Sequence, residues 1–288
     1  MSIDVLQEKI RKLKCPMVRD LSVEADQIPQ CVLEAANESA VTVFCKTLMA
    51  GLKGIVPAVR FSFDYFALMG SKGLDALREL IDEAHSLGYY VLLDGPAIHT
   101  PYAARRAAEL LGEGSEFPCD GLMISPYIGS DAIRPFLNRC KADRALFVMV
   151  RTPNKSAAEL QDLMTGARLV HAAAADMVNR HGETILGKCG YSQLAVVTSA
   201  TNAGAVSSLR SKYNRLFLLV DGLDYPGGNA KNVSYGFDRF GHGCAVTVGP
   251  SITAAWKEKE SDGSDYVQQA VTAAERIRNN LSRYITIL

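Results

Sequence analysis

The sequence lacks an excess of charge of either sign, because 31 basic residues are balanced by 31 acidic residues. This balance gives no reason to expect contact with nucleic acid or with an anionic membrane surface. It also lacks a long apolar run. The longest uncharged stretch, Cys189 to Leu209, is interrupted by Gly, Ser, Thr, Gln and Asn, so no membrane span is expected. Asp4 and Glu8 interrupt the first residues, which therefore do not resemble a secretory signal.

Paired cysteines and the common catalytic motifs are also missing. The seven cysteines are scattered, and no two have CxxC spacing, which predicts reduced thiols in a cytoplasmic protein. There is no glycine-rich dinucleotide fingerprint, P-loop, G-x-S-x-G elbow or HExxH pair. Asp221 and Asp224 share one loop, but they lack supporting ligands nearby, so we expect neither a metal nor an organic cofactor.

What the sequence does have is enough apolar side chain for a folded core, at 48% hydrophobic and 22% charged residues. Eight short apolar runs predict strands at 16–21, 55–61, 89–94, 121–125, 146–150, 194–198, 216–220 and 244–248. These runs are apolar throughout rather than alternating. That pattern is typical of parallel strands covered on both faces.

Helical patterns fill the gaps between these runs. Residues 73–88 carry an apolar stripe and end at Gly88, and residues 156–182 predict a helix interrupted near Gly166. An opening helix at 2–14 and a helical region at 252–286 would cap the ends. Eight strands alternating with helices favour an α/β fold, a (β/α)8 TIM barrel forming a single domain over 1–288. An open doubly wound sheet is the alternative.

In such barrels the chemistry lies where the strands end at their carboxyl side. Asp94 could act as a base, or it could only accept hydrogen bonds from its loop. Arg60 suits a phosphate or carboxylate, or it could pair with Asp94. His99 could be an acid or base, or a solvated loop residue. The candidate ligand-binding residues at the strand ends are Asp20, Ser22, Thr152, Gly227, Gly228, Gly249 and Ser251.

Several segments in order resemble the orotidine 5′-phosphate decarboxylase family in its longer bacterial (type 2) form. The strongest are ISPYIGSDAIRPFL at 124–137 and RTPNKSAAELQDL at 151–163, supported by IVPAVRFSFDYFALMGSKGLDAL, GKCGYSQLAVVTSAT, LLVDGLDYPGG and CAVTVGPSITAAW. The resemblance implies a (β/α)8 barrel that converts orotidine monophosphate to UMP and CO2 without a cofactor. It also implies a homodimer in which an alternating Lys and Asp array, one Asp coming from the partner, performs the reaction.

The positions that carry this chemistry in the family are changed here. The motif Asp-x-Lys-x-x-Asp falls on DGPAIH, so Asp94 matches, Pro96 replaces the proton-donating lysine and His99 replaces the second aspartate. The lysine after the second strand becomes Arg60. The first-strand aspartate falls on Ser22, unless Asp20 takes its place. The phosphate-binding glutamine and arginine fall on Pro226 and Pro250, which lack both a side-chain donor and a backbone N–H.

These replacements predict a non-catalytic or functionally diverged homologue related to pyrimidine (UMP) biosynthesis. The alternative is an active decarboxylase, or an enzyme with new chemistry at Asp94, His99 and Arg60. Its partners would be a nucleotide or other small molecule and a second copy of the chain. Neither nucleic acid nor a membrane is expected as a partner.

Overall fold

At the centre of the computed structural model, which describes residues 2–35, 39–258 and 262–288, is a closed barrel of parallel strands. The strands are β1 (Met17–Asp20), β2 (Ala58–Ser62), β3 (Tyr90–Asp94), β4 (Gly121–Ile124), β5 (Ala145–Met149), β8 (Leu194–Ser199), β9 (Leu218–Asp221) and β10 (Cys244–Val248). Strand β1 pairs with both β2 and β10, which closes the ring. The predicted (β/α)8 barrel is therefore confirmed, and the open sheet is excluded.

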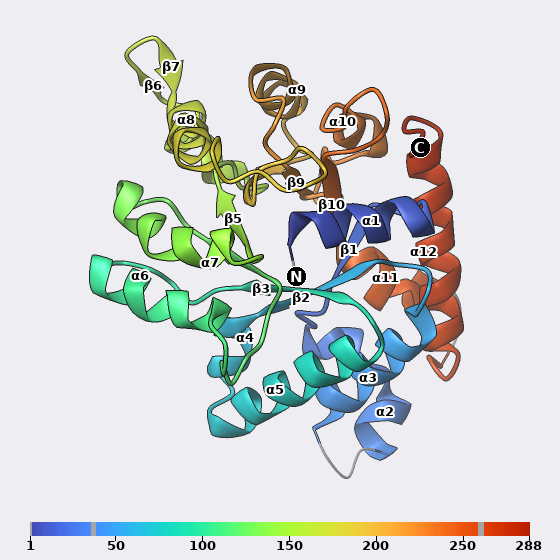
Figure 1. Ribbon diagram of the computed structural model, residues 1–288. Helices are drawn as coiled ribbons and strands as arrows, with labels where there is room; N and C mark the ends of the chain where they lie inside the picture. The colour runs from blue at the N-terminus through green and yellow to red at the C-terminus, as the bar shows by residue number, and fades with distance from the viewer. Residues whose placement is uncertain (1, 36–38, 259–261) are drawn as a thin grey trace.

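Each predicted apolar run overlaps one of these strands, and the bounds differ by at most a few residues. The runs lack alternation because both faces of the sheet are covered, one by helices and one by the barrel interior. Figure 1 shows the strands at the centre of the molecule with helices placed around them.

Helix α1 precedes the first strand, and the other helices lie between and after the strands in chain order. They are α1 (Ile3–Leu13), α2 (Gln30–Ala35), α3 (Ala40–Leu52), α4 (Phe63–Ala67), α5 (Ser71–Ser86), α6 (Pro101–Ala107), α7 (Leu137–Lys141), α8 (Val170–Gly182), α9 (Ala203–Lys212), α10 (Ala230–Ser234), α11 (Pro250–Thr253) and α12 (Tyr266–Ser282). Short 3-10 turns lie at Ala25–Gln27, Ala108–Leu111, Gly129–Ala132, Arg134–Phe136, Lys155–Glu159 and Ala255–Glu258. The helices predicted at 2–14 and 73–88 correspond to α1 and α5.

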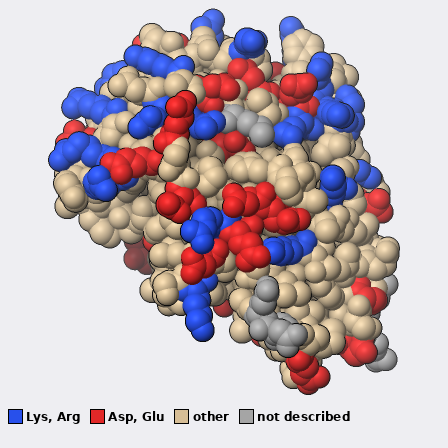
Figure 2. Space-filling view, turned by 60° about the horizontal axis from the view of Figure 1, so that its bottom comes forward, with Lys and Arg blue, Asp and Glu red and all other residues tan. Residues whose placement is uncertain are grey.

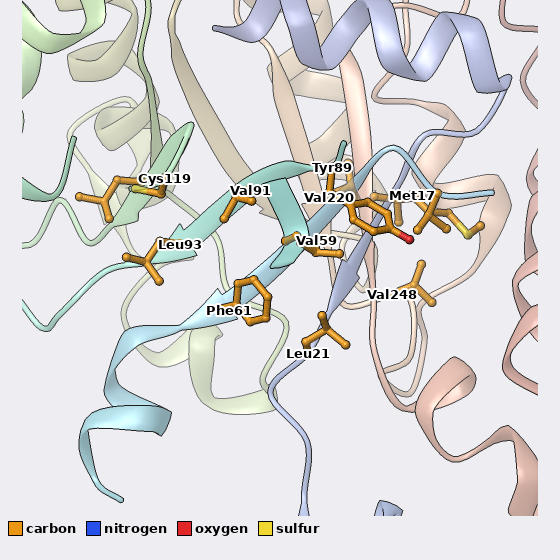
Figure 3. Close-up of a cluster of buried hydrophobic side chains, with 14 of the residues drawn as sticks. Met17, Leu21, Val59, Phe61, Tyr89, Val91, Leu93, Cys119, Val220 and Val248 are labelled. Carbon is orange, nitrogen blue, oxygen red and sulfur yellow. The ribbon is translucent and has the colours of Figure 1, made fainter. Parts of the chain in front are cut away.

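The core has two layers because successive side chains on a strand point to opposite faces. The outward layer packs between strands and helices and includes Met17, Val59, Val91 and Val248, which Figure 3 draws together. The inward layer fills the barrel with large side chains, among them Tyr90, Phe147 and Phe217. The rings of Phe147 and Phe217 meet edge to face with centroids 6.5 Å apart. Apolar residues of α1 pack against this inward layer and close one end of the barrel: Ile3, Leu6 and Ile10.

Two helical predictions were only partly right. Within 156–182, α8 forms the second half, but the first half is a 3-10 turn and a hairpin of β6 (Met164–Thr165) and β7 (Arg168–Leu169). Gly166 has φ of 64°, a left-handed conformation that ends a helix and permits the tight hairpin. Within 252–286, α11 and a 3-10 turn precede α12. Residues 259–261 of that prediction lie outside the described part of the chain.

The surface has no extended field of one charge on the face drawn in Figure 2, where acidic and basic side chains are intermingled. All seven cysteines are free thiols, and most of them are buried. Within the described ranges, no helix has both the length and the apolar character needed to cross a membrane.

Candidate active site

Alternation along the strands brings four charged side chains to the same end of the barrel. In β1, β2, β3 and β9 the inward residues Val18, Ala58, Leu92 and Leu219 belong to the interior cluster. The next inward position on each strand is Asp20, Arg60, Asp94 and Asp221 respectively. Strand register sets Asp20 directly beside Arg60. These residues therefore meet at the carboxyl end of the barrel, where the sequence placed the site.

Three aspartates surround the guanidinium of Arg60. Its Nη2 lies 3.2 Å from Asp20 Oδ2 and 3.6 Å from Asp94 Oδ2, and its Nη1 donates to Asp221 Oδ2 at 3.2 Å. Only 12% of the Arg60 side chain is exposed. The pairing of Arg60 with Asp94 that the sequence suggested is present, but Asp20 and Asp221 lie closer. The first-strand carboxylate in this cluster is Asp20, two residues before Ser22.

The cluster perturbs the ionisation of its own members. Burial lowers the pKa of Arg60, but the negative charges of Asp20, Asp221 and Asp94 outweigh that effect and hold it above its usual value. Burial raises the pKa of Asp94 to about 6, and repulsion by Asp20 and Asp221 adds to this while Arg60 opposes it. Arg60 therefore stays charged, whereas Asp94 changes its protonation near neutral pH.

A pocket of about 340 Å³ opens beside this cluster, between the ends of β1, β2, β9 and β10. Its lining residues are Asp20, Arg60, Asp221, Gly222, Leu223, Asp224, Tyr225, Pro226, Thr247, Gly249 and Pro250. Of the residues that the structure describes, three carboxylates and one guanidinium line it, and no lysine does. The pocket has the size of a small-molecule site, but its charge is predominantly negative.

Two of the backbone donors expected to hold an anion, those of Gly228 and Gly249, are already used within the chain. The N–H of Gly249 donates to Asp224 Oδ2 at 2.6 Å, and the N–H of Gly228 donates to the carbonyl of Tyr225 at 2.9 Å. Pro226 and Pro250 have no N–H to add. The carboxylate of Asp224 therefore occupies a donor that a phosphate would need.

The remaining candidate residues lie outside the lining of this pocket. His99 is exposed on the loop after β3, and Pro96 is partly buried on the same loop. The hydroxyl of Thr152 donates to Asn154 Oδ1 at 2.6 Å, and its N–H donates to Gln161. The N–H of Ser22 donates to Asp20 Oδ1 at 2.9 Å, so Ser22 supports the cluster through its backbone. Gly227 is exposed and Ser251 partly buried.

Sequence reasoning missed two features of the site. Asp221 was considered only as a weak metal ligand and as negative charge on the rim, yet it holds Arg60. Thr247 was not considered, although it lines the pocket. The polar residue within the otherwise apolar run CAVTV was the available signal, because Thr247 shares a face with the inward Ala245.

The chemistry open to these groups is limited. Arginine does not give up a proton near neutral pH, so Arg60 cannot serve as a general acid. Asp94, with its pKa raised to about 6, is suited to proton transfer near neutrality. In the described part of the chain, no group of three His, Cys, Asp or Glu side chains could hold a metal ion.

Known proteins with similar sequences and folds share one description. No family model matches the chain. A curated orotidine 5′-phosphate decarboxylase from Rhodopirellula baltica is 30% identical and covers 88% of this chain and 89% of its own. One from Caldicellulosiruptor bescii is 26% identical over 98% of both chains.

Solved structures agree on the fold. The orotidine 5′-monophosphate decarboxylase of Plasmodium berghei superimposes with a TM-score of 0.78 at 13% identity, over 98% of this chain and 99% of its own. The OMP decarboxylase of Leishmania donovani gives a TM-score of 0.71 at 24% identity, over 97% of this chain and 100% of its own. With a 30% identical relative aligned over most of both chains, this chain belongs to the orotidine 5′-phosphate decarboxylase family.

Proposed function

We propose that this protein is a non-catalytic, ligand-binding member of the decarboxylase family, related to pyrimidine (UMP) biosynthesis. The observation that carries the proposal is the state of Arg60. It replaces a family lysine and is held by Asp20, Asp94 and Asp221. The strongest support for the proposal is therefore that the terminal nitrogens of Arg60 are paired with three carboxylates of the same chain.

The missing proton donor supports the same conclusion. The family resemblance places the proton-donating lysine at position 96, where proline has no side chain that could deliver a proton. Loss of a general acid typically costs a factor of about 10²–10⁴ in rate. Because the neighbouring groups are changed as well, and such groups act as a unit, the losses cannot be read one residue at a time.

The arrangement around Asp224 argues against tight phosphate binding. Its carboxylate accepts the N–H of Gly249, and Asp221 lies on the same pocket wall. A phosphate entering here would displace one carboxylate and face another. Like charges repel appreciably even at an effective dielectric constant of about 20.

The decisive experiment follows the absorbance of orotidine monophosphate during incubation with purified protein, with a working family decarboxylase as the positive control. We expect no turnover above background. Turnover at ordinary enzymatic rates, about 1–10³ per second, would refute the proposal. The single variant Pro96→Lys should also remain inactive, because His99, Pro226 and Pro250 are unchanged. Recovery by that one change would show that the other replacements matter little.

A second candidate is an enzyme, and the raised pKa of Asp94 favours it. A carboxyl group that titrates near pH 6 is suited to act as acid or base at neutral pH. In this alternative, Asp94 would work with Arg60 and His99, either on orotidine monophosphate or in new chemistry. A bell-shaped or sigmoidal rate profile with an inflection near pH 6, abolished by Asp94→Asn, would support it over the first proposal.

We further propose that the protein is a cytoplasmic homodimer joined across the barrel mouths. Large apolar side chains on the loops that follow the strands support a protein contact there. Leu68 is 90% exposed and Tyr127 is 80% exposed, after β2 and β4 respectively. Large exposed apolar side chains on these segments would supply contact area for a second copy of the chain.

A further inference from the structure

The mouth pocket carries an unbalanced negative charge. Asp20 places one carboxylate oxygen against Arg60, and its other oxygen accepts the N–H of Ser22. Asp221 does the same, with its second oxygen accepting the N–H of Gly222. Asp224 has no Lys or Arg of the described residues at ion-pair distance. Among the described residues that line the pocket, Arg60 is the one cation against three carboxylates, so the lining holds two more negative than positive formal charges. The buried guanidinium of Arg19, which interacts electrostatically with Asp20 and Asp224 from behind the wall, offsets part of this excess.

A buried hydroxyl without a partner lines the same pocket. Thr247 is only 4% exposed, and its Oγ1 has no hydrogen-bond partner among the residues that the structure describes. It lies on the inward face of β10, one inward position beyond Ala245, and contributes to the pocket wall. Buried polar groups are almost always hydrogen-bonded, so an orphaned hydroxyl facing a cavity indicates a missing polar partner there.

The rest of the wall is apolar and aromatic. Leu223, Tyr225 and Pro226 line one side and Pro250 lines another, within a volume of about 340 Å³. An aromatic ring favours a neighbouring organic cation, which also gains from burying its hydrocarbon part. A bare metal ion fits less well, because no group of three His, Cys, Asp or Glu within the described ranges is arranged to ligate one.

We infer that this pocket binds a small organic cation, a primary ammonium or guanidinium group on a short apolar stem. The cationic head lies against Asp221 and Asp224 and donates one hydrogen bond to Thr247 Oγ1, while the stem packs on Leu223 and Tyr225. This inference rests on the proposal that the site no longer turns over orotidine monophosphate. It inverts the charge preference of the site, from a phosphate ester to a cation.

A matched ligand series tests the charge directly. Isothermal titration calorimetry on the full chain at pH 8 and low salt would compare n-butylammonium, 1-butanol and butyrate, which differ mainly in the head group. We expect butylammonium to bind at least tenfold more tightly than butanol, and butyrate to show no binding. Magnesium ion is a further arm. If Mg²⁺ binds more tightly than butylammonium and competes with it, the organic-cation assignment is wrong.

Variants locate the binding. Asp224→Asn keeps an acceptor for the N–H of Gly249 but removes a charge, and Thr247→Val removes the hydroxyl at nearly the same shape. We expect a loss of at least tenfold for Asp224→Asn and about threefold or more for Thr247→Val. Asp82→Asn, on the exposed face of α5, makes the same charge change away from the pocket and should have no effect.

Absence of butylammonium binding to the unaltered protein, equal binding of butyrate, or equal affinity in all three variants would each overturn the inference. The binding assay contains no orotidine monophosphate, so a negative result contradicts only the cation inference. The proposed function would be contradicted by a different result, which is turnover of orotidine monophosphate.

Discussion

Replacement of Arg60 by Met should destabilise the protein in a strongly pH-dependent way. Methionine keeps an unbranched stem of similar length but removes the guanidinium that pairs with Asp20, Asp94 and Asp221. Removing one partner of a buried ion pair costs about 3–5 kcal/mol. The three aspartate side chains are 18%, 33% and 15% exposed, so solvent screens part of this loss. We expect about 2–4 kcal/mol at pH 8.

The sign of the pH dependence follows from the carboxylates left behind. The pKa of Asp94, already raised to about 6, rises further without the opposing charge of Arg60, so the folded state of the variant binds more protons at mildly acid pH. The stability of the variant then falls as pH increases, and its deficit is smaller at pH 5 than at pH 8. Urea denaturation at both pH values, followed by circular dichroism, measures this deficit from the midpoint and slope.

The matched control is Arg78→Met on α5. Arg78 also pairs with two carboxylates, Asp75 and Glu116, but half of its side chain is exposed. Exposed pairs contribute about 0–1 kcal/mol, so this variant should lose little at either pH. A loss below about 1 kcal/mol for Arg60→Met, or the same loss at both pH values, would refute the view that Arg60 holds the three carboxylates together.

Three other predictions concern the same end of the barrel. The unfolding free energy of Asp94→Asn, relative to that of the unaltered protein, should increase by about 1–2 kcal/mol from pH 4.5 to pH 8. The reason is that ionisation of a carboxyl group whose pKa is raised to about 6 destabilises the folded protein, whereas an amide does not ionise. If the stabilities of the two proteins change with pH in parallel, this prediction is wrong. UMP should bind no more tightly than the high-micromolar range, about −5 to −6 kcal/mol, and a sub-micromolar dissociation constant by calorimetry would mean that Arg60 or Arg151 has taken over the phosphate. Sedimentation velocity at micromolar concentration should show a dimer, and Tyr127→Asp should shift it toward monomer; an unaltered protein that sediments only as monomer would count against the mouth-to-mouth contact.

The sequence by itself determined the barrel, because the information for it is local. Eight apolar runs without alternation mark strands buried on both faces, and each run overlaps one barrel strand. The helices at 73–88 and 2–14 could also be predicted from the sequence, because the apolar residues of a helix repeat every 3.6 residues within a single segment. The hairpin at Met164–Leu169 was not, because its short strands carry no long periodic pattern and Gly166 signals only an interruption.

Only the tertiary structure decided which charged side chains of the site contact one another. Alternation fixes that Asp20, Arg60, Asp94 and Asp221 point inward, but the contacts between them depend on the stagger of strands far apart in the chain. Asp221 lies 3.2 Å from Arg60 across 161 residues of sequence, and Asp224 reaches Gly249 from a neighbouring loop. Ring closure brings β9 and β1 to either side of β10. No local pattern encodes such distances, and they place three carboxylates around Arg60 and bring Asp224 onto Gly249 at the mouth of the barrel.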